Sequence, residues 1–208
     1  MPEGWGVSEI GKEVKVLGGG TPRTNRVEFW GDGIHCFVTP KDMSTLPAKV
    51  LLGSERHITE LGVNAISSKQ LPAGTVLLSS RAPIGYLAIA GVPVSVNQGM
   101  IAMVCEGSLS NYYVLHWTQF NMDEIEARAG GTTFAEISKK NFRPIPCLVP
   151  PEGLVNAFDE IASPVFSKIE ENLRESSTLE SIRDALLPKL LSGEIRVGQA
   201  EEIVAEIA

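Results

Sequence analysis

Hydrophobic side chains recur at helical spacing between residues 151 and 191, and this is the longest pattern in the chain. The steps between them are three or four residues, and once six, which keeps them on one side of a helix. These residues, the apolar stripe, are Leu154, Phe158, Ile161, Val165, Ile169, Leu173, Leu179, Ile182, Leu186 and Leu190. Gly193 is a natural end for the helix, whereas Pro164 indicates either a kink or the start of a second segment. So long a helix needs partners along its stripe, unless it folds back on its own domain.

Before residue 150, short apolar runs alternate with glycines, prolines and polar residues. Runs typical of strands lie at 14–17, 34–38, 76–81, 85–92, 100–104 and 145–149, and short helices are expected at 58–66 and 111–125. This mixture predicts an α+β fold, in which a mixed α/β domain precedes a long C-terminal α-helix. We expect a first domain over 1–150, a hinge at 150–153, a helical region over 151–197 and an acidic tail over 198–208.

The charge of the chain is unevenly distributed. The net charge is −7, yet residues 1–150 hold 13 basic and 13 acidic side chains, and the excess acid lies in residues 151–208. The first domain is therefore neutral on average and can carry a basic face. No apolar run approaches the ~20 residues of a membrane span, so we expect a cytoplasmic protein.

Motifs for bond-making chemistry are missing from the sequence. The glycines at 18–20 are not followed by the Lys-Ser/Thr of a phosphate-binding loop, and there is no GxSxG and no Asn/Asp-Pro-Pro-Tyr/Phe run. Residues 29–33 imitate a cofactor motif but lack the preceding strand, so we expect a turn there. The cysteines and histidines are isolated, which disfavours a metal site. We therefore expect no cofactor, no metal and no catalysis.

Several segments, in a shared order over residues 2–197, resemble the specificity subunits of type I restriction–modification enzymes. They are Gly19-Gly20-Thr21-Pro22 with Trp30-Gly31 and Thr39-Pro40-Lys41-Asp42, Thr75 to Arg81 with Ile84-Gly85, Asn97-Gln98-Gly99, Thr132 to Ser138 leading to Ile145-Pro146, and Leu186 to Ile195. The resemblance implies a target-recognition domain that binds double-stranded DNA, followed by a conserved helix. It also implies methylation (M) and restriction (R) subunits as partners, which perform the catalysis.

The chain departs from the family pattern because a full-length member carries two recognition domains and two long helices, and here there is one of each. It is similar to a half subunit or a truncated product. The resemblance implies that two chains form a homodimer through an antiparallel coiled coil. The expected interface residues are Phe158, Ile161, Val165, Ile169, Leu173, Leu179, Ile182 and Leu186.

Polar residues where strands end are the candidates for DNA contacts, because Arg, Lys, Gln, Ser and Thr bind phosphates and base edges. The set is Thr21, Arg23, Thr24, Lys41, Ser79, Ser80, Arg81, Gln98, Thr132, Thr133, Lys139, Lys140 and Arg143. Local turn bonding is an alternative for the hydroxyls, a carboxylate partner for Arg81, and a solvated face for the last three. Two other functions stay open: a methyltransferase or nuclease with a disguised site, and a coiled-coil scaffold.

Overall fold

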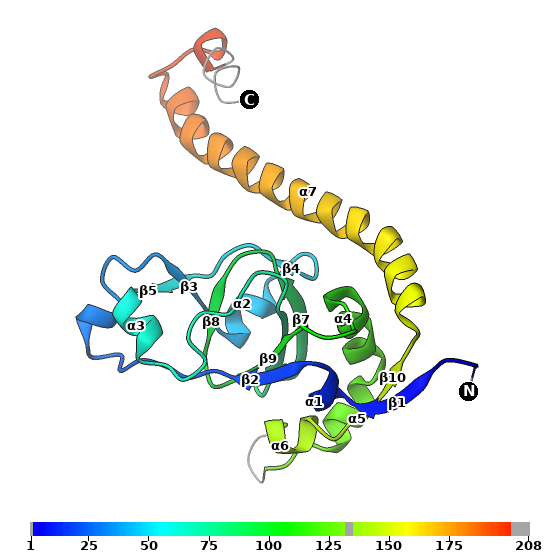
Figure 1. Ribbon diagram of the computed structural model, residues 1–208. Helices are drawn as coiled ribbons and strands as arrows, with labels where there is room; N and C mark the ends of the chain where they lie inside the picture. Colours follow the sequence, from blue (N-terminus) through cyan, green and yellow to red (C-terminus); the bar gives the residue numbers. More distant parts are fainter. Residues whose placement is uncertain (1, 132–134, 201–208) are drawn as a thin grey trace. The chain divides into compact units, whose positions relative to one another are not determined.

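The computed structural model describes residues 2–131 and 135–200. The chain divides into two compact units, Met1–Phe166 and Ser167–Ala208. The first unit contains all the β-strands of the described residues, and Figure 1 shows how its elements are arranged. The prediction of a mixed α/β domain followed by a long C-terminal helix is confirmed, whereas the pairing of two helices stays a prediction.

In the described part of the chain the largest sheet has five strands. Their order is β2 (Lys15–Gly18), β9 (Met100–Val104), β6 (Val76–Ser80), β7 (Ile84–Ala90) and β4 (Val50–Leu51). A smaller sheet has the order β5 (Arg56–Ile58), β3 (His35–Val38) and β8 (Val94–Val96), and β1 (Gly6–Glu9) pairs with β10 (Pro146–Val149). All neighbours are antiparallel except β3 with β8 and β4 with β7.

Both faces of the large sheet are covered, which explains why β6 and β9 are apolar without alternation. Successive side chains of a strand point to opposite faces. In β6, Val76 and Leu78 enter a core shared with α4 (Asn111–Phe120), whereas Leu77 enters a second core shared with β3 and β8. Each of these three side chains is fully buried. The central strands therefore join two hydrophobic layers into one rigid unit.

Several short helices pack against the sheets. On the first core lie α1 (Ile10–Glu13), α5 (Met122–Ala127) and α6 (Lys139–Phe142), and near the small sheet lie η1 (Val27–Phe29), α2 (Pro40–Ser44) and α3 (Glu60–Asn64). The segment 39–42, which follows β3, contains the start of α2. The Thr39 and Asp42 side chains form a capping box there, which stabilises the first helical turn. The expected helix at 58–66 is shorter than predicted because Ile58 belongs to β5.

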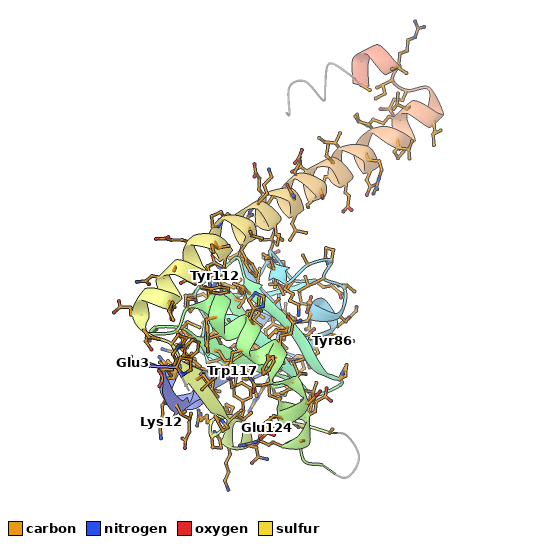
Figure 2. All side chains as sticks on the ribbon, turned by 90° about the vertical axis from the view of Figure 1, so that its right-hand side faces the viewer. Glu3, Lys12, Tyr86, Tyr112, Trp117 and Glu124 are labelled. Carbon is orange, nitrogen blue, oxygen red and sulfur yellow. The ribbon has the colours of Figure 1, made fainter. Side chains whose placement is uncertain are left out.

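The long helix α7 (Glu152–Ser192) is continuous, so the possibility that Pro164 starts a second segment is wrong. Its first turns belong to the first unit because they pack on α4. Val155 and Ala162 are buried, and the centroids of the Tyr112 and Phe166 rings lie 4.9 Å apart. Figure 2 shows Tyr112 at the end of α4 that lies near the first turns of α7. Ser110 caps α4 by accepting a hydrogen bond from the Tyr113 backbone, and its hydroxyl donates to Asp159 at 2.6 Å. The compact unit therefore continues past the predicted boundary at residue 150.

Candidate nucleic-acid interface

Loops from several strands meet at one end of the large sheet. β2 ends at Gly18 and β6 ends near Ser79, and both pair there with the start of β9, through Gly18 to Ile101 and Ser79 to Met100. The small sheet contributes a further loop, because Val38 and Val96 are parallel partners and the Asn97 backbone N–H donates to the Val38 carbonyl at 3.0 Å. We call this region the polar end. It comprises residues 18–24, 39–42, 81–83, 97–99 and 136–140.

Close backbone packing holds the first loop of the polar end against the loop before β9. A Cβ atom on Gly19 would lie 1.9 Å from the Val96 carbonyl oxygen, so only glycine fits at this position. The Gly20 backbone N–H donates to the same carbonyl at 3.0 Å. This contact brings the exposed side chains of Thr21 and Gln98 together, and the Thr21 hydroxyl donates to the Gln98 side-chain oxygen. Two predicted DNA-binding residues, 77 positions apart in sequence, therefore form one polar pair.

Arg81 lies beside this pair and is held by a weak ion pair. Its side chain is 37% exposed, and its Nη1 atom lies 3.4 Å from a carboxylate oxygen of Glu136. A Cβ atom on Gly99 would contact the Arg81 Nε atom at 3.5 Å, which shows that the guanidinium spreads over the loop before β9. The alternative that Arg81 has a carboxylate partner is thus correct. Such an exposed pair contributes only about 0–1 kcal/mol, so Arg81 can exchange it for another anion at small cost.

The predicted basic cluster separates into two kinds of side chain. Lys139 and Lys140 are exposed on α6, which Ser138 caps by accepting from the Asn141 backbone, and the Lys139 side chain extends over Gly18. Arg143 differs, because its Nη2 atom donates to the Val16 carbonyl at 2.8 Å and its side chain packs over Gly11. Lys139 therefore reaches the polar end, and Lys140 follows it on α6. Neither lysine forms an ion pair among the residues that the structure describes, whereas Arg143 stabilises β2.

Other predicted residues have different surroundings. The prediction for Ser79 and Ser80 needs correction, because both are buried within β6, which continues two residues past its apolar part. The Ser79 hydroxyl donates to the Pro83 carbonyl and accepts from the Tyr86 backbone, both at 2.8 Å, and is unavailable to DNA. Lys41 is exposed but lies 2.6 Å from the Glu55 carboxylate, which raises the pKa of Lys41.

Arg23 and Thr24 are exposed in the loop after β2, and Thr132 and Thr133 lie outside the described residues. One residue that the sequence did not indicate is Arg56, whose guanidinium stacks over the Trp30 ring at 3.7 Å. Arg56 pairs with Phe37, which lies two positions before the 39–42 segment of the polar end. It was missed because it begins a strand rather than following one.

The described part of the chain contains neither a group of metal-binding side chains nor a membrane-spanning helix. Within residues 2–131 and 135–200, no three His, Cys, Asp or Glu side chains are grouped so that they could hold an ion. No helix of that same portion is sufficiently long and apolar to cross a bilayer. Burial raises the pKa of the Cys105 and Cys147 thiols to about 12, so both stay protonated at neutral pH.

The chain is similar to known proteins over most of its length. The family described as the type I restriction modification DNA specificity domain matches residues 2–157. The chain belongs to this family. The specificity subunit of the type I restriction enzyme MjaIX, from Methanocaldococcus jannaschii, is 34% identical over 184 residues. That of HindI, from Haemophilus influenzae, is 26% identical over 198 residues.

The match covers nearly all of this specificity chain but only part of each relative. It covers 88% and 94% of this chain, and 42% of each of the two relatives. A solved HsdS subunit from Thermoanaerobacter tengcongensis shares the fold, with a TM-score of 0.56 and 20% identity over 94% of this chain and 46% of that one. The chain thus spans less than half the length of the relatives that it matches.

Proposed function

We propose that this chain is the sequence-specific DNA recognition component of a type I restriction–modification system and has no catalysis of its own. The observation that carries the proposal is the polar end, where Thr21, Gln98 and Arg81 from three loops come together with Lys139 from α6. These loops are supported by a sheet buried on both faces, so the side chains are held in position before DNA arrives. Membership of the DNA specificity domain family supports the same function.

The side chains of the polar end suit two different tasks in the bound complex. Arginine and glutamine read base edges in the major groove by paired hydrogen bonds, and the proposal assigns this task to Arg81 and Gln98. Lysines neutralise phosphates without sequence preference, which is the role of Lys139 and Lys140. The base contacts set the sequence that is bound, and the phosphate contacts set the affinity and the register.

Two copies of the chain pair through α7 in this proposal, and the pair assembles with M and R subunits that methylate and cut DNA. Support comes from the apolar stripe, where Ile161, Val165 and Leu179 are 73%, 55% and 57% exposed. An apolar row of this extent on a helix calls for a partner surface. The length of the relatives, more than twice the matched segment, agrees with a working unit that contains two such halves.

Salt dependence of DNA binding tests the phosphate contacts. We expect the Lys139→Ala, Lys140→Ala double variant to bind every duplex more weakly. The slope of log affinity against log salt should become shallower by about two, because each phosphate contact contributes about 0.9. Fluorescence anisotropy with a labelled duplex between low and high salt measures this slope.

A matched control removes two lysines at the opposite end of the sheet. Lys12 lies just before β2, and Lys49 lies just before β4. Val50 of β4 pairs with Ile89 of β7, and Ile89 also pairs with Val76 at the start of β6, the end of that strand away from the polar end. The Lys12→Ala, Lys49→Ala variant has the same net charge as the test variant. Equal slopes for the two variants would show that overall charge, and not the polar end, determines binding.

A further inference from the structure

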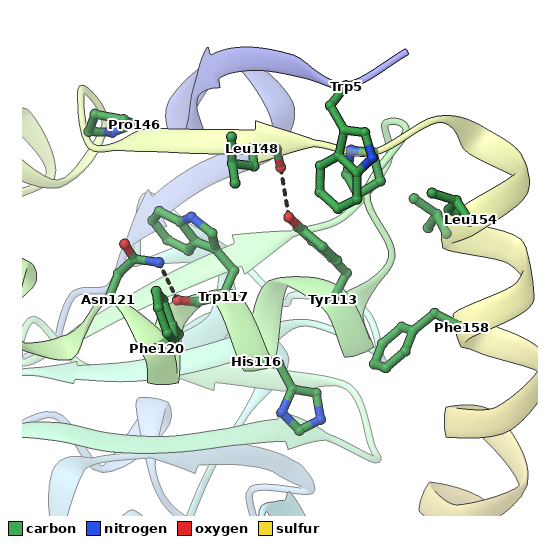
Figure 3. A pocket seen from close by; sticks show the side chains of 12 residues that line it. Trp5, Tyr113, His116, Trp117, Phe120, Asn121, Pro146, Leu148, Leu154 and Phe158 are labelled. Atoms are coloured by element: carbon green, nitrogen blue, oxygen red, sulfur yellow. Dashed lines mark hydrogen bonds between the residues drawn. The ribbon is translucent and has the colours of Figure 1, made fainter. Parts of the chain in front are cut away.

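An apolar groove of about 630 Å³ lies between α4, β10 and the first turns of α7 (Figure 3). Its walls include Trp5, Tyr113, Phe120, Leu148, Leu154 and Phe158. Phe120 is 88% exposed, Leu154 51% and Leu148 47%, an unusual concentration of open apolar surface. The Tyr113 hydroxyl in the wall donates to the Leu148 carbonyl at 2.7 Å, so this hydroxyl already has a partner within the domain. The groove is therefore suited to apolar side chains.

The groove is continuous with the apolar stripe of α7. Leu154 and Phe158 line the groove and also begin the stripe, which continues through the exposed Ile161 and Val165. A partner that covers the stripe along its whole length therefore also reaches the groove. In the proposed pair of chains, one part of the second copy's α7 therefore lies at the groove, and its charges and register indicate which part.

The charges along α7 favour an antiparallel arrangement. Residues 152–166 carry Glu152, Asp159 and Glu160 and no lysine or arginine, whereas residues 181–196 carry three basic side chains and two acidic ones. Two parallel helices would place the acidic beginnings side by side. An antiparallel pair places each acidic beginning beside the more basic end of the other helix, which removes this repulsion. The end of the second helix is therefore the part that lies at the groove.

Register and rotation then select the side chains that enter the groove. Full overlap of the two stripes places Leu154 opposite Leu190. The exposed Leu187 and Leu191 directly follow the stripe residues Leu186 and Leu190. In the same way Val155 follows Leu154, and Val155 is buried against the first unit. One position is a rotation of ~100°. The two-fold axis of an antiparallel pair is perpendicular to the plane of the two helices. Residues that follow the stripe by one position therefore lie on the same face of the pair in both copies. Because Val155 faces its own domain, Leu187 and Leu191 of the second copy point toward that same domain.

We propose that the groove is a socket for the last turns of α7 of a second copy, with Leu187 and Leu191 placed beside Leu154 and Phe158. The inference rests on the proposed pairing of two chains and adds a contact between helix and domain. Each recognition domain is then held by both helices, which fixes its orientation toward DNA.

Disulfide trapping tests the socket. Leu154→Cys and Leu191→Cys variants of the full chain are prepared separately, mixed in equal amounts and oxidised mildly. Both residues belong to one continuous helix, so they cannot meet within a chain. We expect the mixture to yield a dimer band on a non-reducing gel, while each variant alone, like the wild type, stays monomeric on the gel. Cross-linking of one variant with itself would indicate parallel helices and overturn the inference.

Light scattering of the same samples separates failure of the socket from failure of the proposed pairing. A dimeric mass without cross-linking in the mixture would show that the chains pair while the groove takes no helix end, which overturns only the socket. A monomeric mass would overturn both the socket and the pairing. DNA recognition by one domain is measured independently, through the binding of a single half-site.

Discussion

A deletion of seven residues within Glu170–Glu180 should shorten the preferred gap between two half-sites by up to about three base pairs. Seven residues are close to two helical turns, so the apolar stripe stays nearly in phase. The helix loses ~10 Å, and one base pair occupies ~3.4 Å of duplex. In the proposed pair, α7 and not the polar end sets the distance between the two domains, so the half-site sequences should be unchanged.

The gap is measured with the M subunits present, by scoring methylation of a duplex library in which identical half-sites are separated by different spacings. Insertion of seven residues in the same segment is the matched counterpart and should lengthen the gap by a similar amount. An unchanged gap in a folded, dimeric deletion variant would show that α7 does not determine the spacing. Altered half-site bases would place sequence recognition outside the first unit.

Replacement of Arg81 by alanine should have the largest effect on sequence preference. A paired contact from arginine to a base contributes ~1–3 kcal/mol of discrimination. Two-fold symmetry removes that contact from both half-sites, so the affinity for the preferred site should fall by about 30-fold to 10⁴-fold. Binding to unrelated duplexes should weaken far less. Competition assays with specific and random duplexes give the ratio directly.

The matched control is Arg174→Ala, because Arg174 also forms an exposed pair with a glutamate, at 2.7 Å from Glu170, but lies on α7. It should leave the preference intact. The Glu136→Gln variant is informative in the opposite direction, since it releases Arg81 from its carboxylate and should tighten binding. If Arg81→Ala weakens specific and random duplexes equally, Arg81 contacts phosphate and not bases.

Much of the fold could be predicted because its strands and its long helix have strong periodic patterns. β2, β6, β7, β9 and α7 lie close to where apolar runs predicted them. The short helices were harder, because their start depends on a few cap bonds, such as Asn141 donating to Ser138 in α6, and not on a repeating pattern. The burial of Ser79 was also unpredictable, since only its contacts with Pro83 and Tyr86 reveal that its hydroxyl faces inward.

The candidate site was predicted in composition but not in arrangement. The rule that polar residues follow strands found Thr21, Arg81 and Gln98, and the sheet register explains why these lie at one end. Nothing in the sequence distinguished Arg143 from its lysine neighbours, because its role depends on the Val16 carbonyl, 127 positions away. The groove was not predicted either, since it combines residues from both ends of the first unit and from α4.

Selection of bound duplexes from a random library, with the full chain and its M subunits, tests the central claim that the polar end of a paired chain reads DNA. Two identical domains related by a two-fold axis must bind inverted copies of one short sequence. The expected result is a single interrupted palindrome, enriched with a fixed gap and lost from the pool selected with Arg81→Ala. An enriched sequence without inverted halves would contradict the paired arrangement. A pool without any enriched sequence would contradict DNA recognition by this chain.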